Sequence, residues 1–397
     1  MEEWKKCKLG DICKTNINSY SEKDNWSFVN YLDTGNITEN KISDIQFIDL
    51  SSESLPSRAR RKVQLNDIIY STVRPNQKHF GIIKNQPENF LVSTGFAVLH
   101  INKTIADPNF VFYNLIQNEN TETLHAIAEQ TTSAYPAIKP SDIENLSIKL
   151  PPLPTQQKIA AILSSLDDKI ELNNKINTNL EQQAQALFKN WFVDFEPFSG
   201  KMPDNWKLGT IGDLCSTISK TYKGNDSHVV LINTSDVEDG TILNHDSVPN
   251  SKLKGQFKKT FQKGDILYSE IRPANKHYAF VDIETTSNYI ASTKLMVIRP
   301  NEGINPHYLY HILTNPDLIQ EMQHLAETRS GTFPQITFES ELSTYQIPLL
   351  PKEEQDKLGE LFEKIDNQIF HNIKENKQLS TIRDTLLPKL MNGEISV

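Results

Sequence analysis

Cysteine and long apolar runs are scarce in this sequence. The three cysteines, Cys7, Cys13 and Cys215, are odd in number and lack metal-ligand spacing. This argues against a disulfide framework and favours reduced, buried thiols. The opening residues, MEEWKKCKLG, are polar, and no apolar stretch of about 18 residues occurs. We therefore expect a cytoplasmic protein without a signal peptide or a membrane partner.

Recognisable catalytic motifs are missing too. The sequence contains no GxxxxGK[ST] or GxGxxG loop, no HExxH pair, no CxxC and no Asn-Pro-Pro-Tyr motif. Asp204 and Asp317 follow prolines but lack the paired Glu-x-Lys of a nuclease core. We expect no catalytic residue, no metal site and no cofactor in this chain. An enzyme with an unfamiliar site, such as a nuclease, is the alternative.

Positive charge is in the minority. With 41 Lys and Arg against 50 Asp and Glu, the formal net charge is −9. An acidic surface repels duplex DNA, so any contact with nucleic acid would require a local concentration of positive charge.

An internal repeat covers the whole chain. The partner segments stay near 200 residues apart, which indicates two copies of one domain pair and not a solenoid. The matching segments are 4–13 and 206–215, 67–75 and 265–273, 78–79 and 276–277, 93–94 and 292–293, and 135–136 and 333–334.

Each copy has two parts. The first mixes short strand-like runs, such as 29–37, 67–75 and 96–101, with short helices, and it ends in a proline cluster that precedes a helix start. The second part is one long helix. The predicted domains are 1–150 and 201–350, with long helices in 151–200 and 351–397.

The long helices carry apolar residues at a sustained 3.5-residue period, which indicates a coiled coil. Asparagines occupy the same two seam positions in both helices, which suggests that the helices pair with each other. An ordinary amphipathic core helix is the alternative. The residues expected to pair the helices or to dock a partner are Ile159, Leu166, Ile170, Asn173, Asn177, Leu180, Trp191 and Phe192 in the first helix, and Ile365, Ile369, Asn372, Asn376 and Leu379 in the second.

A long chain segment connects the two helices, so they could pack in either a parallel or an antiparallel orientation. Antiparallel packing would place the two globular parts at opposite ends, related by a pseudo-twofold axis. The aromatic cluster Phe188, Trp191, Phe192 and Phe195 fits either a core or a docking patch.

Basic residues concentrate at corresponding positions of the two copies, in 56–84 and 251–277. Paired basic stretches in an acidic protein suggest two DNA-contacting surfaces, with a solvated lysine-rich face as the alternative. The expected DNA-binding residues are Arg58, Arg60, Arg61, Arg74, Lys78, His79 and Tyr135 in the first copy, and Lys258, Lys259, Arg272, Lys276, His277 and Arg329 in the second.

Individual roles within this set stay open. Arg74 and Arg272 suit either guanine or phosphate, and the histidines suit either DNA contact or structural hydrogen bonds. Tyr135 could stack or fill the core. The loops 129–133 and 327–331 differ in sequence on a common scaffold, which predicts two different half-sites.

Two segments carry a family resemblance. Leu150-Pro-Pro-Leu-Pro-Thr-Gln-Gln-Lys-Ile-Ala-Ala-Ile-Leu-Ser-Ser-Leu-Asp-Asp-Lys-Ile-Glu171 and Ala186-Leu-Phe-Lys-Asn-Trp-Phe-Val-Asp-Phe195 look like the central conserved region of type I restriction–modification specificity subunits. In the second copy, Pro351-Lys-Glu-Glu-Gln355 is interpreted as carrying one extra residue at the start of the helix.

The resemblance implies an α/β fold in which two pseudo-twofold-related target-recognition domains with small twisted sheets are separated by two long antiparallel coiled-coil helices. It implies binding of double-stranded DNA at a bipartite asymmetric site. Two methyltransferase subunits that use S-adenosylmethionine, and restriction subunits that use ATP and Mg²⁺, would be partners of a non-catalytic chain. A related methyltransferase or nuclease system without ATP-driven restriction, and a coiled-coil adaptor without DNA contact, are the alternatives.

Overall fold

The computed structural model of this chain describes residues 4–130, 136–329 and 331–397. Contacts divide it into two compact units, Met1–Glu171 with Asn376–Val397 and Leu172–Glu375. Each unit contains one globular domain and a portion of each long helix. Among the described helices, none combines the length and the apolar character that crossing a membrane would need.

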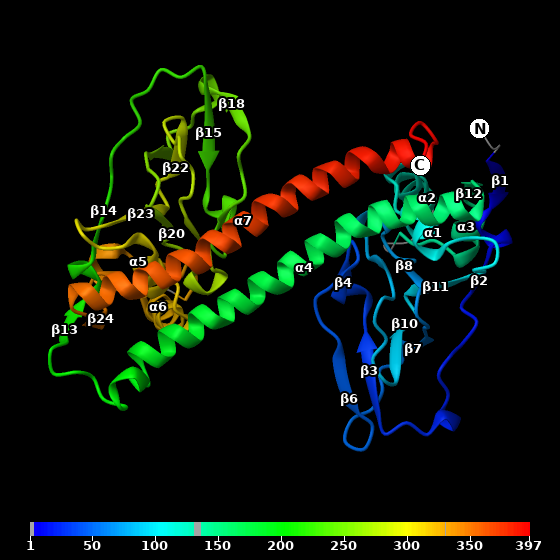
Figure 1. Cartoon of the computed structure of the whole chain (residues 1–397), viewed down its shortest axis with the longest axis horizontal. Helices are drawn as coiled ribbons and strands as arrows, with labels where there is room; N and C mark the ends of the chain where they lie inside the picture. Colours follow the sequence, from blue (N-terminus) through cyan, green and yellow to red (C-terminus); the bar gives the residue numbers. More distant parts are fainter. Residues whose placement is uncertain (1–3, 131–135, 330) are drawn as a thin grey trace. The chain divides into compact units, whose positions relative to one another are not determined.

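The globular domain of the first unit is an α/β domain with short strands (Figure 1). Its strands are β1 (Lys5–Lys8), β2 (Cys13–Thr15), β3 (Phe28–Leu32), β4 (Ile37–Thr38), β5 (Lys41–Ile42), β6 (Gln46–Asp49), β7 (Ala59–Lys62), β8 (Ile68–Ser71), β9 (Phe80–Ile82), β10 (Phe90–Ser93), β11 (Phe96–Ile101) and β12 (Ser147–Leu150). Its helices are α1 (Pro108–Leu115), α2 (Asn118–Glu129) and α3 (Pro140–Glu144).

The globular domain of the second unit repeats this plan. Its strands are β13 (Lys207–Thr210), β14 (Cys215–Thr217), β15 (His228–Ile232), β16 (Val237–Glu238), β17 (Thr241–Ile242), β18 (Ser247–Pro249), β19 (Phe257–Lys259), β20 (Ile266–Ser269), β21 (Tyr278–Phe280), β22 (Tyr289–Ser292), β23 (Leu295–Pro300) and β24 (Gln346–Leu349). Its helices are α5 (Pro306–Leu313), α6 (Pro316–Arg329) and the short π-helix η10 (Phe338–Leu342).

The strand topology confirms the duplication. The first domain has sheets ordered β6-β3-β10-β7 and β2-β11-β8-β9, and the second has β18-β15-β22-β19 and β14-β23-β20-β21. One parallel pair, β3 with β10 and β15 with β22, occurs in each copy. A register shift recurs as well, where β10 pairs with β7 and where β22 pairs with β19.

Two hydrophobic cores explain why β8 and β20 read as continuous apolar runs. Successive side chains of a strand point to opposite faces of the sheet. Ile68 and Tyr70 therefore enter the core under α1 and α2, whereas Ile69 enters the core beneath β10. In β20, Tyr268 and Leu267 divide between two cores in the same way.

The helices α1 and α5 begin at equivalent caps. The side chain of Asp107 accepts hydrogen bonds from the backbone N–H groups of Asn109 and Phe110, and Asn305 does the same for His307 and Tyr308. Proline occupies the first helical turn in both, where a missing N–H costs nothing. These caps fix the two helices against the long helices of their own units.

The long helices are α4 (Leu153–Phe192) and α7 (Lys352–Met391). Buried Gln156 donates its side-chain amide to the carbonyl of Pro151 at 2.8 Å, and buried Gln355 donates to Leu350 at 2.8 Å. The two glutamines differ by 355 − 156 = 199 positions, the offset of both helix starts. The expectation of an extra residue at the start of the second helix is therefore wrong.

The helix pairing is antiparallel within each unit. In the first unit, Arg383 of α7 donates to Asp167 of α4 at 2.7 Å. In the second, Asn372 donates to Asn177 at 2.7 Å. In the second unit Asn173 also donates to Glu375 at 2.7 Å, and in the first unit Ile159 shares a core with Leu390. Within each unit, the partner that is later in α7 is earlier in α4, so the two helices run in opposite directions. The cysteines are free: Cys215 is buried, whereas Cys7 and Cys13 are half-buried, less than the sequence predicts.

Candidate nucleic-acid interface

The matched Arg-Pro turns have the same strained backbone in both copies. Arg74 precedes the 3₁₀ turn η4 (Pro75–Gln77), Arg272 precedes η9 (Pro273–Asn275), and both arginines adopt φ of 47°. Lys78 and Lys276 close these turns at φ of 56° and 54°. Left-handed backbone at non-glycine residues costs free energy and persists only where the surroundings enforce it.

Backbone hydrogen bonds enforce that geometry. The N–H of Arg74 donates to the carbonyl of Pro136 at 2.9 Å, and that of Arg272 donates to Pro334 at 3.1 Å. Both arginine side chains are exposed. Two independent copies thus hold an exposed arginine in one defined position, which suits a guanidinium that contacts an anion or a base edge.

The Lys-His pairs next to these turns have structural partners. His79 Nδ1 lies 2.6 Å from the carbonyl oxygen of Ile37, and His277 Nδ1 lies 2.9 Å from that of Val237. The neighbouring lysines form ion pairs with the hairpins between β4 and β5 and between β16 and β17, Lys78 with Glu39 at 2.8 Å and Lys276 with Asp239 at 3.8 Å. Of the two roles left open by the sequence, the structure supports hydrogen bonding to the hairpins for the histidines.

Neighbouring basic residues on the strands β7 and β19 lie in different environments. Lys259 donates to the carbonyls of Thr293 and Leu295 at 3.0 and 2.8 Å, and burial lowers its pKa. Burial also lowers the pKa of Arg61, whose Nε has no hydrogen-bond partner within the part of the chain that the structure describes. These two side chains are therefore half-buried against their own domain.

Arg60 and Lys258 occupy equivalent strand positions, because their carbonyls accept hydrogen bonds from Tyr20 and Tyr222. Considering only residues 4–130, 136–329 and 331–397, Arg58, Arg60, Lys258 and Arg272 form no ion pair. Cations without a carboxylate partner are available to phosphate. These four residues are therefore the candidates for phosphate contact within the two basic stretches.

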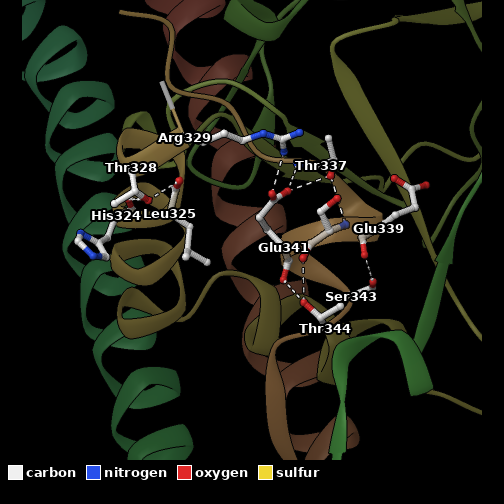
Figure 2. Close-up of polar contacts among 10 residues, drawn as sticks. His324, Leu325, Thr328, Arg329, Thr337, Glu339, Glu341, Ser343 and Thr344 are labelled. Atoms are coloured by element: carbon white, nitrogen blue, oxygen red, sulfur yellow. Dashed lines mark hydrogen bonds and ion pairs between the residues drawn. The ribbon is translucent and has the colours of Figure 1, made fainter. Parts of the chain in front are cut away.

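Arg329, at the end of α6, is held by an acidic partner. Its Nη1 donates to Glu341 Oε1 at 2.8 Å, and Glu341 Oε2 accepts from the backbone N–H and the hydroxyl of Thr337 at 2.7 and 2.9 Å (Figure 2). The guanidinium is half exposed. Tyr135 lies outside the described residues, and Phe333, its counterpart, is exposed.

The seam residues of α4 and α7 lie in several environments. Ile159, Ile170 and Asn173 are buried, as are Asn177, Phe192 and Asn372. Leu166, Leu180, Trp191, Ile365, Ile369, Asn376 and Leu379 are half-buried. Phe192 packs in the second core beside Trp206 and Tyr308, and Trp191 contacts Phe198. The aromatic cluster at the end of α4 thus belongs to the core.

Sequence reasoning missed two carboxylates that join the domains to the long helices, Asp167, which is half-buried, and Asp366, which is buried. Asp167 of α4 accepts from the hydroxyl of Tyr113 at 2.6 Å as well as from Arg383. Asp366 of α7 accepts from His307 at 2.7 Å and from His311 at 3.0 Å. Aligning the two copies at the 199-residue offset places Asp167 and Asp366 together, which is the signal that could have found them.

The histidine partners of Asp366 also set its pKa. Burial would raise the pKa of Asp366, but the hydrogen bonds from His307 and His311 outweigh it and hold that pKa below its usual value. Among the described residues, no group of three or more His, Cys, Asp or Glu side chains could hold a metal ion. The arrangement offers positive charge and hydrogen-bond donors on duplicated loops, which is the chemistry of nucleic-acid recognition.

Comparison with known proteins decides the family. The family model described as the type I restriction modification DNA specificity domain matches residues 1–182 and again residues 203–381. The chain belongs to this family. The two matched ranges correspond to the two copies of the duplicated architecture. The prediction that the chain is a DNA-specificity subunit without catalytic activity of its own is confirmed.

Individual relatives agree. The chain is 30% identical to the type I restriction enzyme HindI specificity subunit of Haemophilus influenzae, with 100% of each chain covered. It is 28% identical to the type I restriction enzyme MjaIX specificity subunit of Methanocaldococcus jannaschii, over 67% of this chain and 64% of that protein. The solved type I restriction–modification S subunit from M. genitalium has a TM-score of 0.65 at 16% identity, covering 98% and 96% of the two chains, and shares the fold.

Proposed function

We propose that each globular domain of this specificity subunit reads one half of a bipartite, asymmetric DNA site. The recognition domains are residues 1–150 and 201–350, and the conserved helices are 151–200 and 351–397. The observation that carries the proposal is the repeated Arg-Pro turn, whose backbone is the same in both copies while the neighbouring loops differ in sequence. An equal scaffold with unequal loops suits two unlike half-sites.

Phosphate and base contacts divide between two groups of residues in this proposal. Arg58, Arg60 and Lys258, which lie on or beside the edge strands β7 and β19, would contact phosphates and set the register of the domain on the duplex. Arg74 and Arg272, fixed by their turns, would approach guanine edges or a phosphate bidentately. Lys78, His79, Lys276 and His277 act one step further away, because they hold the hairpins beside the turns.

The long helices are the proposed platform for two methyltransferase subunits. Leu172 and Ile176, four residues apart on α4, are exposed apolar side chains on one helix face. Exposed apolar residues at that spacing suit a partner helix. S-adenosylmethionine would bind to the methyltransferase subunits and ATP with Mg²⁺ to restriction subunits, and the complex would act in the cytoplasm, where the DNA is.

A domain exchange tests the modular arrangement. Residues 1–150 are replaced with the first recognition domain of a related specificity subunit. The variant is combined with its methyltransferase, and genomic DNA methylated by this complex is sequenced to locate the methylated positions. One half-site should change and the other should stay.

Arg74→Ala and Arg272→Ala should each weaken binding through a different half-site. An unchanged methylation pattern, or loss at both half-sites from one substitution, contradicts the proposal.

A further inference from the structure

A cavity of about 590 Å³ lies within the second unit. It is bounded by α4, α6 and α7, by the hairpin of β16 and β17, and by residues of α5. Such a volume lies within the range of cavities that hold small organic ligands. Among the described residues assigned to DNA binding or to its support, Lys276 alone lines this cavity.

The floor of the cavity is aromatic and apolar. Phe188 of α4, Tyr278 of β21, Tyr310 of α5 and Phe370 of α7 line it. Gly240, at φ of 91°, closes one side so tightly that a Cβ there would clash with the hydroxyl of Tyr310. The close approach of Gly240 therefore fixes one aromatic wall.

Acidic side chains surround this floor. Glu181, Asp239 and Glu327 are exposed carboxylates at the rim, and Asp366 is buried at the base. Lys276 is the one lysine or arginine among the described lining residues, and it lies 3.8 Å from Asp239. Asp366 is hydrogen-bonded to His307 and His311, which leaves three carboxylates at the rim beside Lys276 among the described lining residues. Clefts lined with one sign of charge above low-dielectric walls concentrate counter-ions.

Two of the rim carboxylates, Glu181 and Glu327, lie beyond ion-pair distance of any cation in the described part of the chain, although the charge of Lys276 reaches Glu181. Counting only residues that the structure describes, neither Glu181 nor Glu327 forms an ion pair, and Glu327 accepts one hydrogen bond, from Gln323 at 2.7 Å. Burial and the charge of Asp239 raise the pKa of Glu181, and the charge of Lys276 offsets this only in part, so the fold disfavours the charged form of this carboxyl group. His324 also lines the cavity, and its ring points from α6 toward α4 (Figure 2).

We propose that this cavity binds a linear polyamine, with its methylene chain across the aromatic floor and its ammonium groups at Glu181 and Glu327. Ammonium groups are attracted to aromatic faces as well as to carboxylates, and a methylene chain removes apolar surface from water. Nucleotides and other anions do not suit an acidic rim. A single ammonium would neutralise one carboxylate and leave the other unpaired.

The test measures binding of spermidine to the purified full chain by isothermal titration at about 0.15 M salt, where exposed charges are screened. The test variant is Glu181→Gln/Glu327→Gln. The matched control is Glu122→Gln/Glu129→Gln, which removes two carboxylates from α2, the corresponding helix of the first copy. We expect one spermidine per chain, at least tenfold weaker binding to the test variant, and binding to the control within about twofold of the unmodified chain.

Butylamine, which carries one ammonium group, should bind at least tenfold more weakly than spermidine. Equal affinity for butylamine, equal losses in test and control variants, or binding that does not saturate at one molecule per chain would each overturn the proposal.

A second measurement does not depend on the folding of any variant. In the unmodified chain with ¹³C-labelled histidine, spermidine should shift the ring signals of His311 and His324, which line the cavity. The signal of His125 on α2 should stay in place. Equal shifts at all three rings, or none, contradict the assignment.

Discussion

The two recognition domains share a backbone but differ in what their buried carboxylates contact. Asp67 and Asp265 stand at equivalent positions, and each accepts a backbone hydrogen bond at 2.8 Å, from Gln64 and Gln262. In the first copy the side-chain partner is His100, at 2.9 Å. In the second it is Arg299, which donates two hydrogen bonds at 2.7 Å.

The carboxylates of the long helices show the reverse exchange. Asp167 in the first unit is held by Arg383 and Tyr113, whereas Asp366 in the second is held by His307 and His311. Arginine stays charged at all physiological pH values, but histidine does not. Duplication therefore preserved the main-chain hydrogen bonds and left the charged partners free to diverge. The two copies should respond differently to mutation and pH.

The largest difference is expected at Asp366. Its side chain and those of His307 and His311 are nearly inaccessible, so Asp366→Ala leaves two buried imidazoles without their acceptor. Breaking a buried polar pair costs about 3–5 kcal/mol. Urea unfolding would measure the loss, and hydrogen exchange would place it in α5.

Asp167→Ala is the matched control. Asp167 and Arg383 are more exposed than the Asp366 cluster, so we expect about 1–2 kcal/mol, with loss of protection in α1. Equal losses, or exposure of α1 by the Asp366 variant, would show that the two units do not unfold separately.

A smaller effect should follow from exchanging the partners of Asp67 and Asp265. Arg299→His removes a bidentate ion pair with a carboxylate that is 1% exposed, and it should destabilise the second unit by about 1–2 kcal/mol. His100→Arg should leave the first unit unchanged or slightly more stable. Thermal unfolding of both single variants and of the double variant measures this, and a stabilising Arg299→His would refute it.

The pH dependence should have opposite signs at two aspartates. Burial raises the pKa of Asp67, so its protonated form is favoured in the folded state, and its contribution to stability is lost as the pH rises through the folded-state pKa. The lowered pKa of Asp366 gives a contribution that is present above the unfolded pKa and is lost as the pH falls.

Unfolding free energies of the unmodified chain, Asp67→Asn and Asp366→Asn between pH 6 and 3 would show these signs. We define the difference as the unfolding free energy of the unmodified chain minus that of the variant. On acidification this difference should fall for Asp366→Asn and should rise for Asp67→Asn. Parallel slopes would mean that the partners of the two carboxylates do not set their pKa values.

The repeat and the coiled-coil period predicted the architecture because they depend on features that a sequence displays directly. Strands such as β8 and β11 and the two long helices lie where the pattern placed them. The heptad pattern placed Ile365 on the seam, yet its neighbour Asp366 is the more deeply buried. It is buried by histidines of α5, an element that the helix period alone does not describe.

The basic stretches show a second limit. Counting local charge cannot tell which cations are already paired, because the partners are distant in sequence. Lys78 pairs with Glu39, Lys62 with Asp24, and Lys259 with backbone carbonyls more than 30 positions away. Only the fold separates such residues from Arg60 and Lys258.

The smallest effects concern those two residues, which extend the comparison from stability to DNA. If Arg60 and Lys258 each contact one phosphate, Arg60→Ala and Lys258→Ala should each weaken DNA binding about threefold to tenfold and reduce the slope of log affinity against log salt by about one. Lys259→Ala is the matched control, because the Lys259 side chain is half-buried and donates to backbone carbonyls of its own domain. It should lower stability without changing the salt slope. The assay is DNA binding by the specificity subunit with its methyltransferase between about 50 and 200 mM salt. Mutating either half-site of the DNA should then remove the difference for one variant and keep it for the other, and a salt slope that is the same in all three variants would remove both residues from the interface.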